Sequence, residues 1–182
     1  MDSETGGWES AAGMLWWHGL AFDMVALGGR AYAMGGYRDY TGNDIDIELM
    51  ERYDETTNKW SQVASYPMYV HHHCMVADEE TGRIWSMGGR HRGGSYRNST
   101  SERSEVYYYQ ESSNSWHHAK NMIWYRRHHS CGIVKMSSND EKRLYIVGGY
   151  HGGWRWVAKL NSMRKDGIIK IPTFAHFNVE FF

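Results

Sequence analysis

The sequence has little of several features that mark common classes of protein. Its 182 residues include two cysteines and two prolines, and 20 Lys plus Arg nearly balance 21 Asp plus Glu. Two cysteines cannot build a disulfide scaffold, and a chain without basic excess is not a general binder of nucleic acids or acidic membranes. No apolar run approaches the ~18 residues of a membrane-spanning helix, and residues 1–7 lack the marks of a secretory signal. We therefore expect about one cytoplasmic domain, with both cysteines as buried thiols.

Aromatic residues and glycine are abundant by comparison. The chain has 9 Trp, 13 Tyr and 20 Gly, and hydrophobic residues make up 41% of it. This composition provides enough apolar material for a core, and it favours short strands separated by tight turns over helices. The predicted fold class is all-β.

The same pattern occurs several times along the chain. A glycine pair closes a short apolar run three times, and a tyrosine precedes a tryptophan by seven residues twice. The period, measured from Trp8 to Trp60 to Trp116, is 52 and then 56 residues. The residues that define the repeat are Gly35, Gly36, Gly88, Gly89, Gly148, Gly149, Tyr53, Trp60, Tyr109 and Trp116.

Turn residues divide each period into four strands. Gly6, Asn58 and Asn114 each lie two residues before a repeat tryptophan, and Gly and Asn tolerate positive φ, so one type of hairpin turn is expected at all three places. A second hairpin is expected before each glycine pair, at 27–30, 78–83 and 137–142. One strand therefore starts near a histidine, the next ends in Gly-Gly, the third carries the tyrosine and the fourth the tryptophan.

This pattern resembles the kelch repeat, which has a double glycine followed by a spaced tyrosine and tryptophan and a period of about 50 residues. The resemblance implies an incomplete β-propeller of four-stranded antiparallel blades, the galactose oxidase-like fold. Residues 1–17 would be the last strand of a preceding blade, 18–66 and 71–124 two blades, and 127–153 the first half of another. Residues 154–182 depart from the pattern, and extra strands are expected there at 168–171 and 177–182.

The blade count is too small for a closed propeller, which needs roughly four to eight blades. An open fan would expose the aromatic sides of its outer blades to water. Three explanations remain: a piece of a longer protein, a truncated gene product, or a chain that completes its ring with another copy. Self-association through the exposed blade edges belongs to the third.

Histidines next to cysteines suggest metal ligands at first sight. His71–Cys74 and His128–Cys131 lie near the start of predicted first strands, with His18 in the earlier copy. Successive strand residues point to opposite faces, however, and no established metal-ligand spacing is present. We predict no metal site and no cofactor, although first strands that line a central channel would bring His73 and His129 together. The repeat tyrosines and tryptophans are assigned to packing between blades.

The loops that leave the glycine pairs, and those that link the blades, are the expected binding region. They vary while the framework repeats, and they carry Arg, Tyr, Trp and His, which are common at protein interfaces. Guanidinium groups pair with carboxylates, so an acidic or phosphorylated segment of a partner protein is favoured. The predicted partner-binding residues are Tyr37, Arg38, Arg90, His91, Arg92, Tyr125, Arg126, Arg127, Tyr150 and His151.

The leading functional interpretation is a protein-interaction module without chemistry of its own. Resemblance to kelch proteins implies capture of a partner protein, and many members deliver that partner to a cullin-type ubiquitin ligase. The alternative is an enzyme resembling copper radical oxidases or sugar-acid epimerases, but no catalytic motif is found. A third hypothesis is a fragment with no independent activity.

Overall fold

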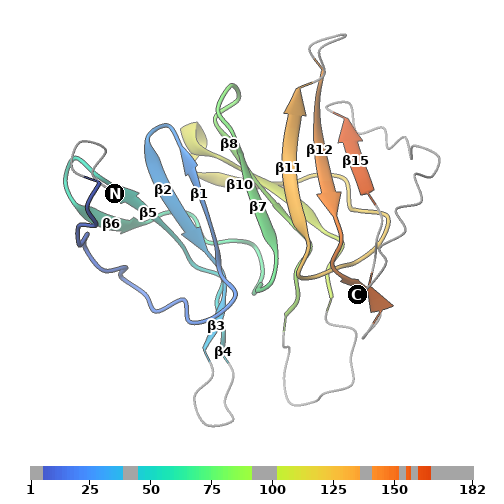
Figure 1. Ribbon diagram of the computed structural model, residues 1–182, viewed down its shortest axis with the longest axis horizontal. Helices are drawn as coiled ribbons and strands as arrows, with labels where there is room; N and C mark the ends of the chain where they lie inside the picture. The colour runs from blue at the N-terminus through green and yellow to red at the C-terminus, as the bar shows by residue number, and fades with distance from the viewer. Residues whose placement is uncertain are drawn as a thin grey trace.

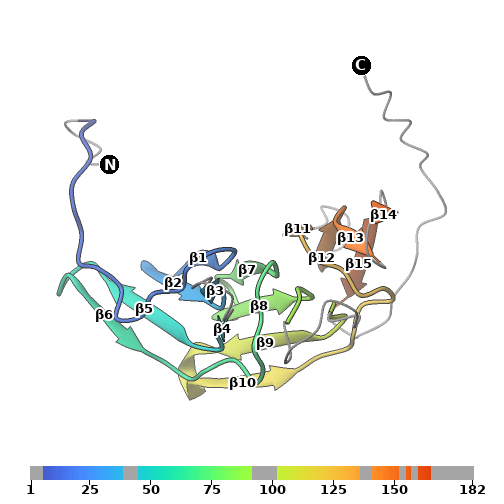
Figure 2. The same cartoon turned by 90° about the horizontal axis from the view of Figure 1, so that it is seen from below.

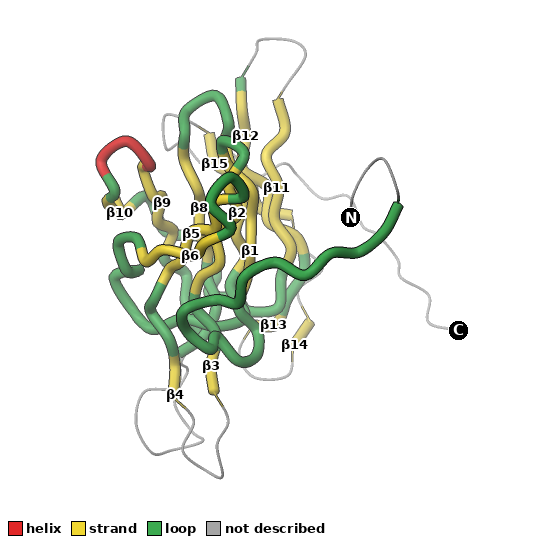
Figure 3. Tube along the Cα trace, turned by 90° about the vertical axis from the view of Figure 1, so that its left-hand side faces the viewer, coloured by secondary structure: helices red, strands yellow, loops and turns green. Residues whose placement is uncertain are grey.

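A computed structural model describes residues 6–38, 45–91, 102–135, 141–151, 155–156 and 160–164. Almost all regular structure in these ranges is β, together with one short 3-10 helix at Glu111–Ser113 between two strands (Figure 3). The described part of the chain contains no helix with the length and apolar character needed to cross a membrane. The all-β prediction is confirmed.

Three antiparallel sheets follow one another along the chain. The first contains β1 (Asp23–Leu27), β2 (Arg30–Met34), β5 (Met50–Asp54) and β6 (Lys59–Gln62), in that order. The second contains β7 (Cys74–Asp78), β8 (Arg83–Met87), β9 (Val106–Gln110) and β10 (Ser115–His118). The third contains β11 (Ser130–Lys135), β12 (Lys142–Val147) and β15 (Leu160–Arg164). Two small hairpins pair β3 (Tyr37–Arg38) with β4 (Ile45–Asp46), and β13 (Tyr150–His151) with β14 (Arg155–Trp156).

The sheets form an open fan (Figures 1 and 2). Their first strands, β1, β7 and β11, lie side by side on the inner side of the arc, while β6 and β10 lie on its outer side. The sheets thus have the arrangement of propeller blades, and we refer to them as blades 1, 2 and 3. All four strands of blade 1 fall within 18–66, and all four of blade 2 within 71–124.

Two other predicted ranges differ from the structure. Strand β15 pairs with β12 from Val147–Leu160 to Arg143–Arg164, so the boundary placed at 153 cuts through blade 3. Residues 6–17, where the last strand of a preceding blade was expected, are described without a strand. The strands predicted at 168–171 and 177–182 lie outside the described residues.

Strand register defines which positions in the three blades are equivalent. Asp23 pairs with Met34, Cys74 with Met87 and Ser130 with Val147, in each case next to a glycine pair. These three pairs therefore occupy the same place in successive blades. On this alignment His18 is equivalent to Tyr69, so its assignment to the same position as the later histidine clusters was wrong.

The Tyr–Asn–Trp signature joins blades 1 and 2 to the segments that precede them. Tyr109 donates a hydrogen bond through its hydroxyl to Asn114 Oδ1 at 2.9 Å, and this oxygen also accepts one from the Ala64 amide at 2.9 Å. The indole of Trp116 donates to the Ala64 carbonyl at 3.0 Å. The left-handed backbone of Asn114, at φ +46°, directs its side chain toward both donors.

Blade 1 repeats these contacts with the N-terminal segment. Tyr53 and the Ala12 amide donate to Asn58 Oδ1 at 2.9 and 2.8 Å, and Trp60 donates to the Ala12 carbonyl at 2.9 Å. Positive φ at Asn58 (+49°) and Asn114 between paired strands confirms the hairpin turns predicted there, whereas Gly6 shares the positive φ (+67°) but is not followed by a strand within 6–17. Residues near Ala12 therefore take the place before blade 1 that residues near Ala64 take before blade 2.

The hydrophobic core lies between the blades. One cluster joins blades 1 and 2 through residues such as Tyr32, Met50 and Ile84, all completely buried. A smaller cluster, which includes Met87, Val106 and Leu144, joins blades 2 and 3. Because each blade is only one sheet thick, most of its apolar side chains can leave water only against a neighbouring blade.

The glycine pairs lie where the chain passes close to the segments that enter first strands: at Gly88 a Cβ would lie 2.7 Å from the Arg126 carbonyl oxygen, in the entry to the following blade, whereas at Gly89 it would meet the entry to blade 2 itself. At Gly89 the backbone has φ +96°, and a Cβ there would lie 2.7 Å from Val70 Cγ2 and 2.9 Å from the His71 carbonyl oxygen. Any side chain would meet both a forbidden backbone conformation and occupied space. The glycine pairs therefore allow the loops that leave them to start close to the fan axis.

Candidate functional site

Three equivalent backbone bridges bring the predicted binding loops to one end of the fan. Tyr37 bridges to Leu20, Arg90 to His71 and Tyr150 to Arg127. In each blade the bridge ties the residue after the glycine pair to the residue that enters the first strand. The loops are therefore anchored at the same point of every blade.

A line of backbone hydrogen bonds crosses the fan beside these bridges. The amide of His72 donates to the Ala21 carbonyl at 2.9 Å, and the amide of His128 donates to the His72 carbonyl at 3.1 Å. All three residues have positive φ, between +53° and +56°. This uncommon backbone conformation in a non-glycine residue recurs in each blade, and it aligns the entries to the three first strands.

Four aromatic side chains form a continuous row over the three blades, which we call the ring row: Tyr37, His72, His128 and Tyr150. The ring centroids of Tyr37 and His72 are 5.8 Å apart, those of His72 and His128 3.8 Å, and those of His128 and Tyr150 5.5 Å. Both tyrosines were predicted from the sequence as binding residues, whereas the position of the two histidines beside them was not. His72 and His128 lie at equivalent positions of the repeat, and this was the signal in the sequence that their side chains would lie in neighbouring blades.

Arginines flank the ring row. Arg127 Nε donates to Glu102 Oε1 at 3.0 Å, and its guanidinium lies 5.4 Å from the centroid of Tyr150. Arg90 is half-buried, and its charge acts on both histidines of the row, as their pKa values show below. Arg38 is half-buried as well. Arg92 lies outside the described residues.

Arg126 lies inside the protein, although it was predicted at the binding surface. Its side chain is completely buried, and Nη1 donates to the Gly148 carbonyl at 3.0 Å. It occupies the position equivalent to Val70, at the junction of two blades. Burial lowers the pKa of its guanidinium. The structure therefore assigns Arg126 to packing between blades 2 and 3.

The remaining predicted residues lie around this end of the fan in local contacts. His91 Nδ1 lies 3.4 Å from Asp46 Oδ2. His151 Nδ1 donates to the Tyr125 carbonyl at 3.0 Å, and the two rings are 4.2 Å apart. The three predicted tyrosines, Tyr37, Tyr125 and Tyr150, are each half-buried, so part of each ring is available to a partner.

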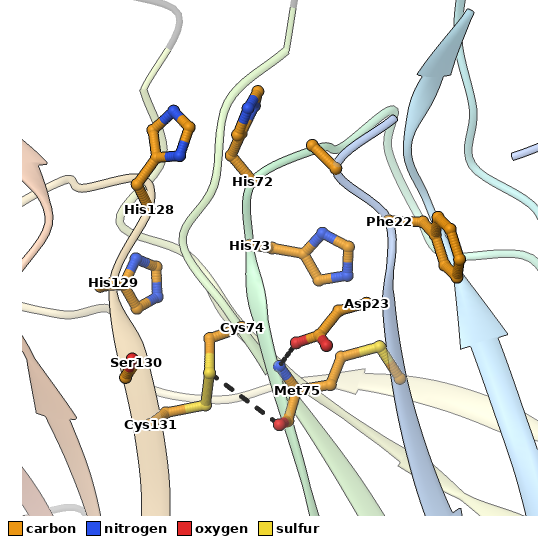
Figure 4. A pocket seen from close by; sticks show the side chains of 11 residues that line it. Phe22, Asp23, His72, His73, Cys74, Met75, His128, His129, Ser130 and Cys131 are labelled. Carbon is orange, nitrogen blue, oxygen red and sulfur yellow. Dashed lines mark hydrogen bonds between the residues drawn. A yellow bond between two sulfur atoms is a disulfide. The ribbon is translucent and has the colours of Figure 1, made fainter. Parts of the chain in front are cut away.

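An axial cleft of about 420 Å³ opens next to the ring row, between the starts of the first strands. Figure 4 shows His72 and His128 at its rim, with His73 and His129 deeper and the two cysteines beyond them. The cleft brings His73 and His129 together, as the sequence predicted. The Nε2 atom of His129 donates to the Met87 carbonyl at 3.0 Å, whereas neither nitrogen of His73 has a hydrogen-bond partner among the described residues.

Burial keeps these histidines neutral. Desolvation, followed by the charge of His129, lowers the pKa of His73 to about 3, and desolvation with the charge of Arg126 lowers that of His129 to about 4. At the rim, desolvation and then the charges of His128, Arg127 and Arg90 lower the pKa of His72 to about 4. The pKa of His128 is lowered by desolvation and by the same two arginines. The site is therefore a region of positive potential lined by neutral imidazoles.

The two cysteines form a disulfide, which corrects the prediction of free thiols. Cys74 at the start of β7 is bonded to Cys131 in β11, with a Cα–Cα distance of 6.0 Å. Cys74 is the first residue of its strand and Cys131 the second residue of the equivalent strand in the next blade, so the two are one position apart in the repeat. Their places near the start of neighbouring first strands were the signal that they would meet. The cytoplasmic localisation relied partly on free thiols, and it stays an untested prediction.

A hydrogen bond occupies the equivalent position one junction earlier. Asp23 corresponds to Cys74, and Met75 corresponds to Cys131. There, the Met75 amide donates to Asp23 Oδ2 at 2.7 Å. Blades 1 and 2 are thus joined by a hydrogen bond, and blades 2 and 3 by a covalent bond.

Within the described ranges, no three His, Cys, Asp or Glu side chains converge in a way that could hold a metal ion. His72 and His128, which have left-handed backbone, lie at the rim, and His73 and His129 lie deeper in the cleft, whereas the rings of His71 and His72 contact each other, with centroids 4.6 Å apart. The arrangement can therefore accept and donate hydrogen bonds and attract negative charge, and it offers aromatic surface for contact.

Comparison with known proteins supports the fold. The family model of the Kelch motif matches residues 20–65, which include all of blade 1. No curated protein matches the sequence. The solved structure of YjhT is similar, with a TM-score of 0.67 and 12% sequence identity over 88% of this chain and 53% of YjhT. The chain thus spans about half the length of that protein. It carries a Kelch motif and has the fold of a partial kelch-type β-propeller.

Proposed function

We propose that the chain is a protein-interaction module that binds an acidic segment of a partner protein across the ring row. The ring row is the observation that carries this proposal, because it presents aromatic side chains from three blades in one contiguous line. Aromatic residues and arginine contribute most to binding energy at protein interfaces.

Charge determines the kind of partner that we expect. Arg90 and Arg127 both lower the pKa of the rim histidines, after desolvation, so positive potential reaches the ring row itself. Two carboxylates near the ring row are already engaged within the part of the chain that the structure describes: Glu102 with Arg127 and Asp46 with His91. An acidic segment would gain from this potential, and a basic one would be repelled.

The test compares one charge reversal on this face with one elsewhere. The chain is titrated with fluorescent peptides of equal length that are glutamate-rich, uncharged or lysine-rich. We expect the glutamate-rich peptide to bind best and its affinity to fall with salt. Arg90→Glu should weaken its binding about tenfold or more, since charged contacts at an interface are worth roughly 1.5–3 kcal/mol each.

Lys59→Glu is the matched control, because it makes the same charge change at an exposed position in the β5–β6 hairpin. Its affinity should stay close to that of the unchanged chain. Equal loss in both variants would mean that only net charge matters, and preference for the lysine-rich peptide would contradict the proposal. Arg127 is unsuitable for this test, because its removal would leave Glu102, a nearly buried carboxylate, without its partner.

Two finer hypotheses extend or compete with this one. Delivery of the bound partner to a cullin-type ubiquitin ligase would be a later step, carried by domains other than the blades described. Among the enzyme alternatives, a copper radical oxidase needs a cysteine thiol beside a tyrosine, and here both cysteines form the disulfide. Binding of a partner protein remains the function that the described residues favour.

A further inference from the structure

The outer side of blade 1 exposes apolar residues whose equivalents are buried. Met24 is 54% exposed, whereas Met75 in blade 2 is 5% exposed. Phe22 is 37% exposed, whereas its equivalents His73 and His129 are each 7% exposed. The difference arises because each later blade is covered by the one before it. We call this surface of blade 1 the entry face.

The opposite end of the fan shows the same contrast. Val147 in blade 3 is 51% exposed, whereas its equivalents Met34 and Met87 are completely buried. Val134 is 47% exposed, and its equivalent Leu27 in blade 1 is 1% exposed. In blades 1 and 2 these positions are covered by the following blade. We call this surface of blade 3 the exit face.

The two faces are the halves of one interface that the chain already contains twice. At each internal junction the exit side of one blade packs against the entry side of the next. An exit face therefore fits the entry face of another copy, by the same contacts that join the blades within the chain. Such a head-to-tail contact closes into a ring if the rotation per copy allows it.

We propose that two copies of this chain associate head to tail into a closed ring of six blades. Propellers close with roughly four to eight blades, so one copy, with three blades among the described residues, is too few and three copies are too many. Closure would remove the exposed apolar residues at both ends of the fan from water.

The N-terminal segment fits this arrangement. Trp8 is 88% exposed, while its equivalents Trp60 and Trp116 lie in the fourth strands of blades 1 and 2. Blade 3 ends at β15 within the described residues, where the other blades have a fourth strand. Residues near Trp8 of one copy would therefore lie beside β15 of the other, and Gly6 has the same sign of φ as its equivalents Asn58 and Asn114.

A cysteine pair tests the proposed register. Ser130 is equivalent to Cys74, and Met24 is equivalent to Cys131, so in the ring Ser130 of one copy faces Met24 of the next. The variant with Met24→Cys and Ser130→Cys should form disulfides between copies under mild oxidation. Non-reducing electrophoresis would then show a species of twice the 21.2 kDa chain mass. The native cysteines do not compete, because they are bonded to each other.

The matched control combines Met24→Cys with Thr56→Cys, which lies exposed in a hairpin away from both faces and should not crosslink. Light scattering on the unchanged chain should give a dimer, and Val147→Lys should convert it to a monomer without loss of β structure in circular dichroism. A monomer in the unchanged chain, larger open assemblies, or a dimer that the designed cysteine pair fails to crosslink would each overturn the proposal.

Discussion

Gly89 shows how much the fold depends on single positions where the backbone passes close to the entry of a first strand. Replacement by alanine would place a methyl group against Val70 and the His71 carbonyl in a strained conformation. We expect Gly89→Ala to lower the free energy of unfolding by about 2–4 kcal/mol, from backbone strain and overpacking together. Urea denaturation measures the change.

Gly132 is the control for this substitution. It lies within β11, without positive φ, and a Cβ there would meet nothing within 4 Å. Gly132→Ala should be neutral or slightly stabilising, because alanine loses less backbone entropy on folding. Similar destabilisation in both variants would show that close packing at Gly89 is not the cause.

Neutral histidines in the axial cleft predict loss of stability in acid. The pKa of His73 is about 3 and that of His129 about 4 in the folded protein, against an ordinary value near 6.5. The unfolded chain thus binds more protons below pH 6.5, and stability falls as the pH drops through the window from about 6.5 to about 4. At pH 5 each of the two should cost about 2 kcal/mol.

Thermal unfolding between pH 7.5 and 5 checks this expectation. A variant with His73→Asn and His129→Asn should lose stability less steeply over this range than the unchanged chain. His117→Asn, which alters an exposed histidine of β10, serves as the control and should keep the original slope. An unchanged slope in the double variant would show that other groups cause the acid sensitivity.

At the scale of secondary structure elements, the repeat pattern predicted strands that local residues specify. Hairpins at 27–30 and 78–83 and the turns at Asn58 and Asn114 were predictable, because glycine and asparagine determine backbone conformation where they stand. Strand β15 was not, because it lacks the aromatic signature and is specified by pairing with β12. The burial of Arg126 could not be predicted either, because an arginine side chain usually lies at the surface and is buried only where neighbouring segments of the fold cover it.

The positions of the binding loops could be predicted from the sequence, but the full set of side chains that forms the ring row could not. Tyr37 and Tyr150 follow glycine pairs, so their place in each blade could be read from the sequence. The ring row also needed His72 and His128, which come from the entry to the next strand. Contacts between blades bring these segments together, and no local pattern encodes such contacts.

The junction between β7 and β11 contains a covalent bond, the disulfide, that substitution of the two cysteines removes. The disulfide closes a loop between residues 57 positions apart, and the chain-entropy model gives about 4 kcal/mol of stabilisation for a loop of this size. We expect Cys74→Ser with Cys131→Ser to lower the free energy of unfolding by about 2–4 kcal/mol. Denaturant unfolding with and without reductant measures it.

The reductant itself distinguishes the cause. Reduction should destabilise the unchanged chain by a similar amount and leave the double serine variant unaffected. If the serine variant is as stable as the oxidised chain, the junction is held by its apolar contacts alone.

At the scale of the whole molecule, each blade is stabilised by packing against its neighbours. Clusters between blades contain most of the buried apolar residues, and each end of the fan exposes the residues that a further blade would bury. The proposed ring and the proposed binding face are linked through this geometry, because closure would extend the line of loop anchors to six blades. The two proposals remain separable: the peptide titration tests the face, and the crosslink tests the ring.

The unequal junctions give the chain a built-in order of mechanical failure. The Asp23–Met75 hydrogen bond between blades 1 and 2 can yield under tension, whereas the Cys74–Cys131 bond cannot. Under a load applied to the two ends, the disulfide carries the force past the chain between Cys74 and Cys131, so β8, β9 and β10 of blade 2 stay folded and this part of the chain stays short. Blade 1 and the strands of blade 3 that follow Cys131 would extend, and the middle of the fan would keep its loops in place.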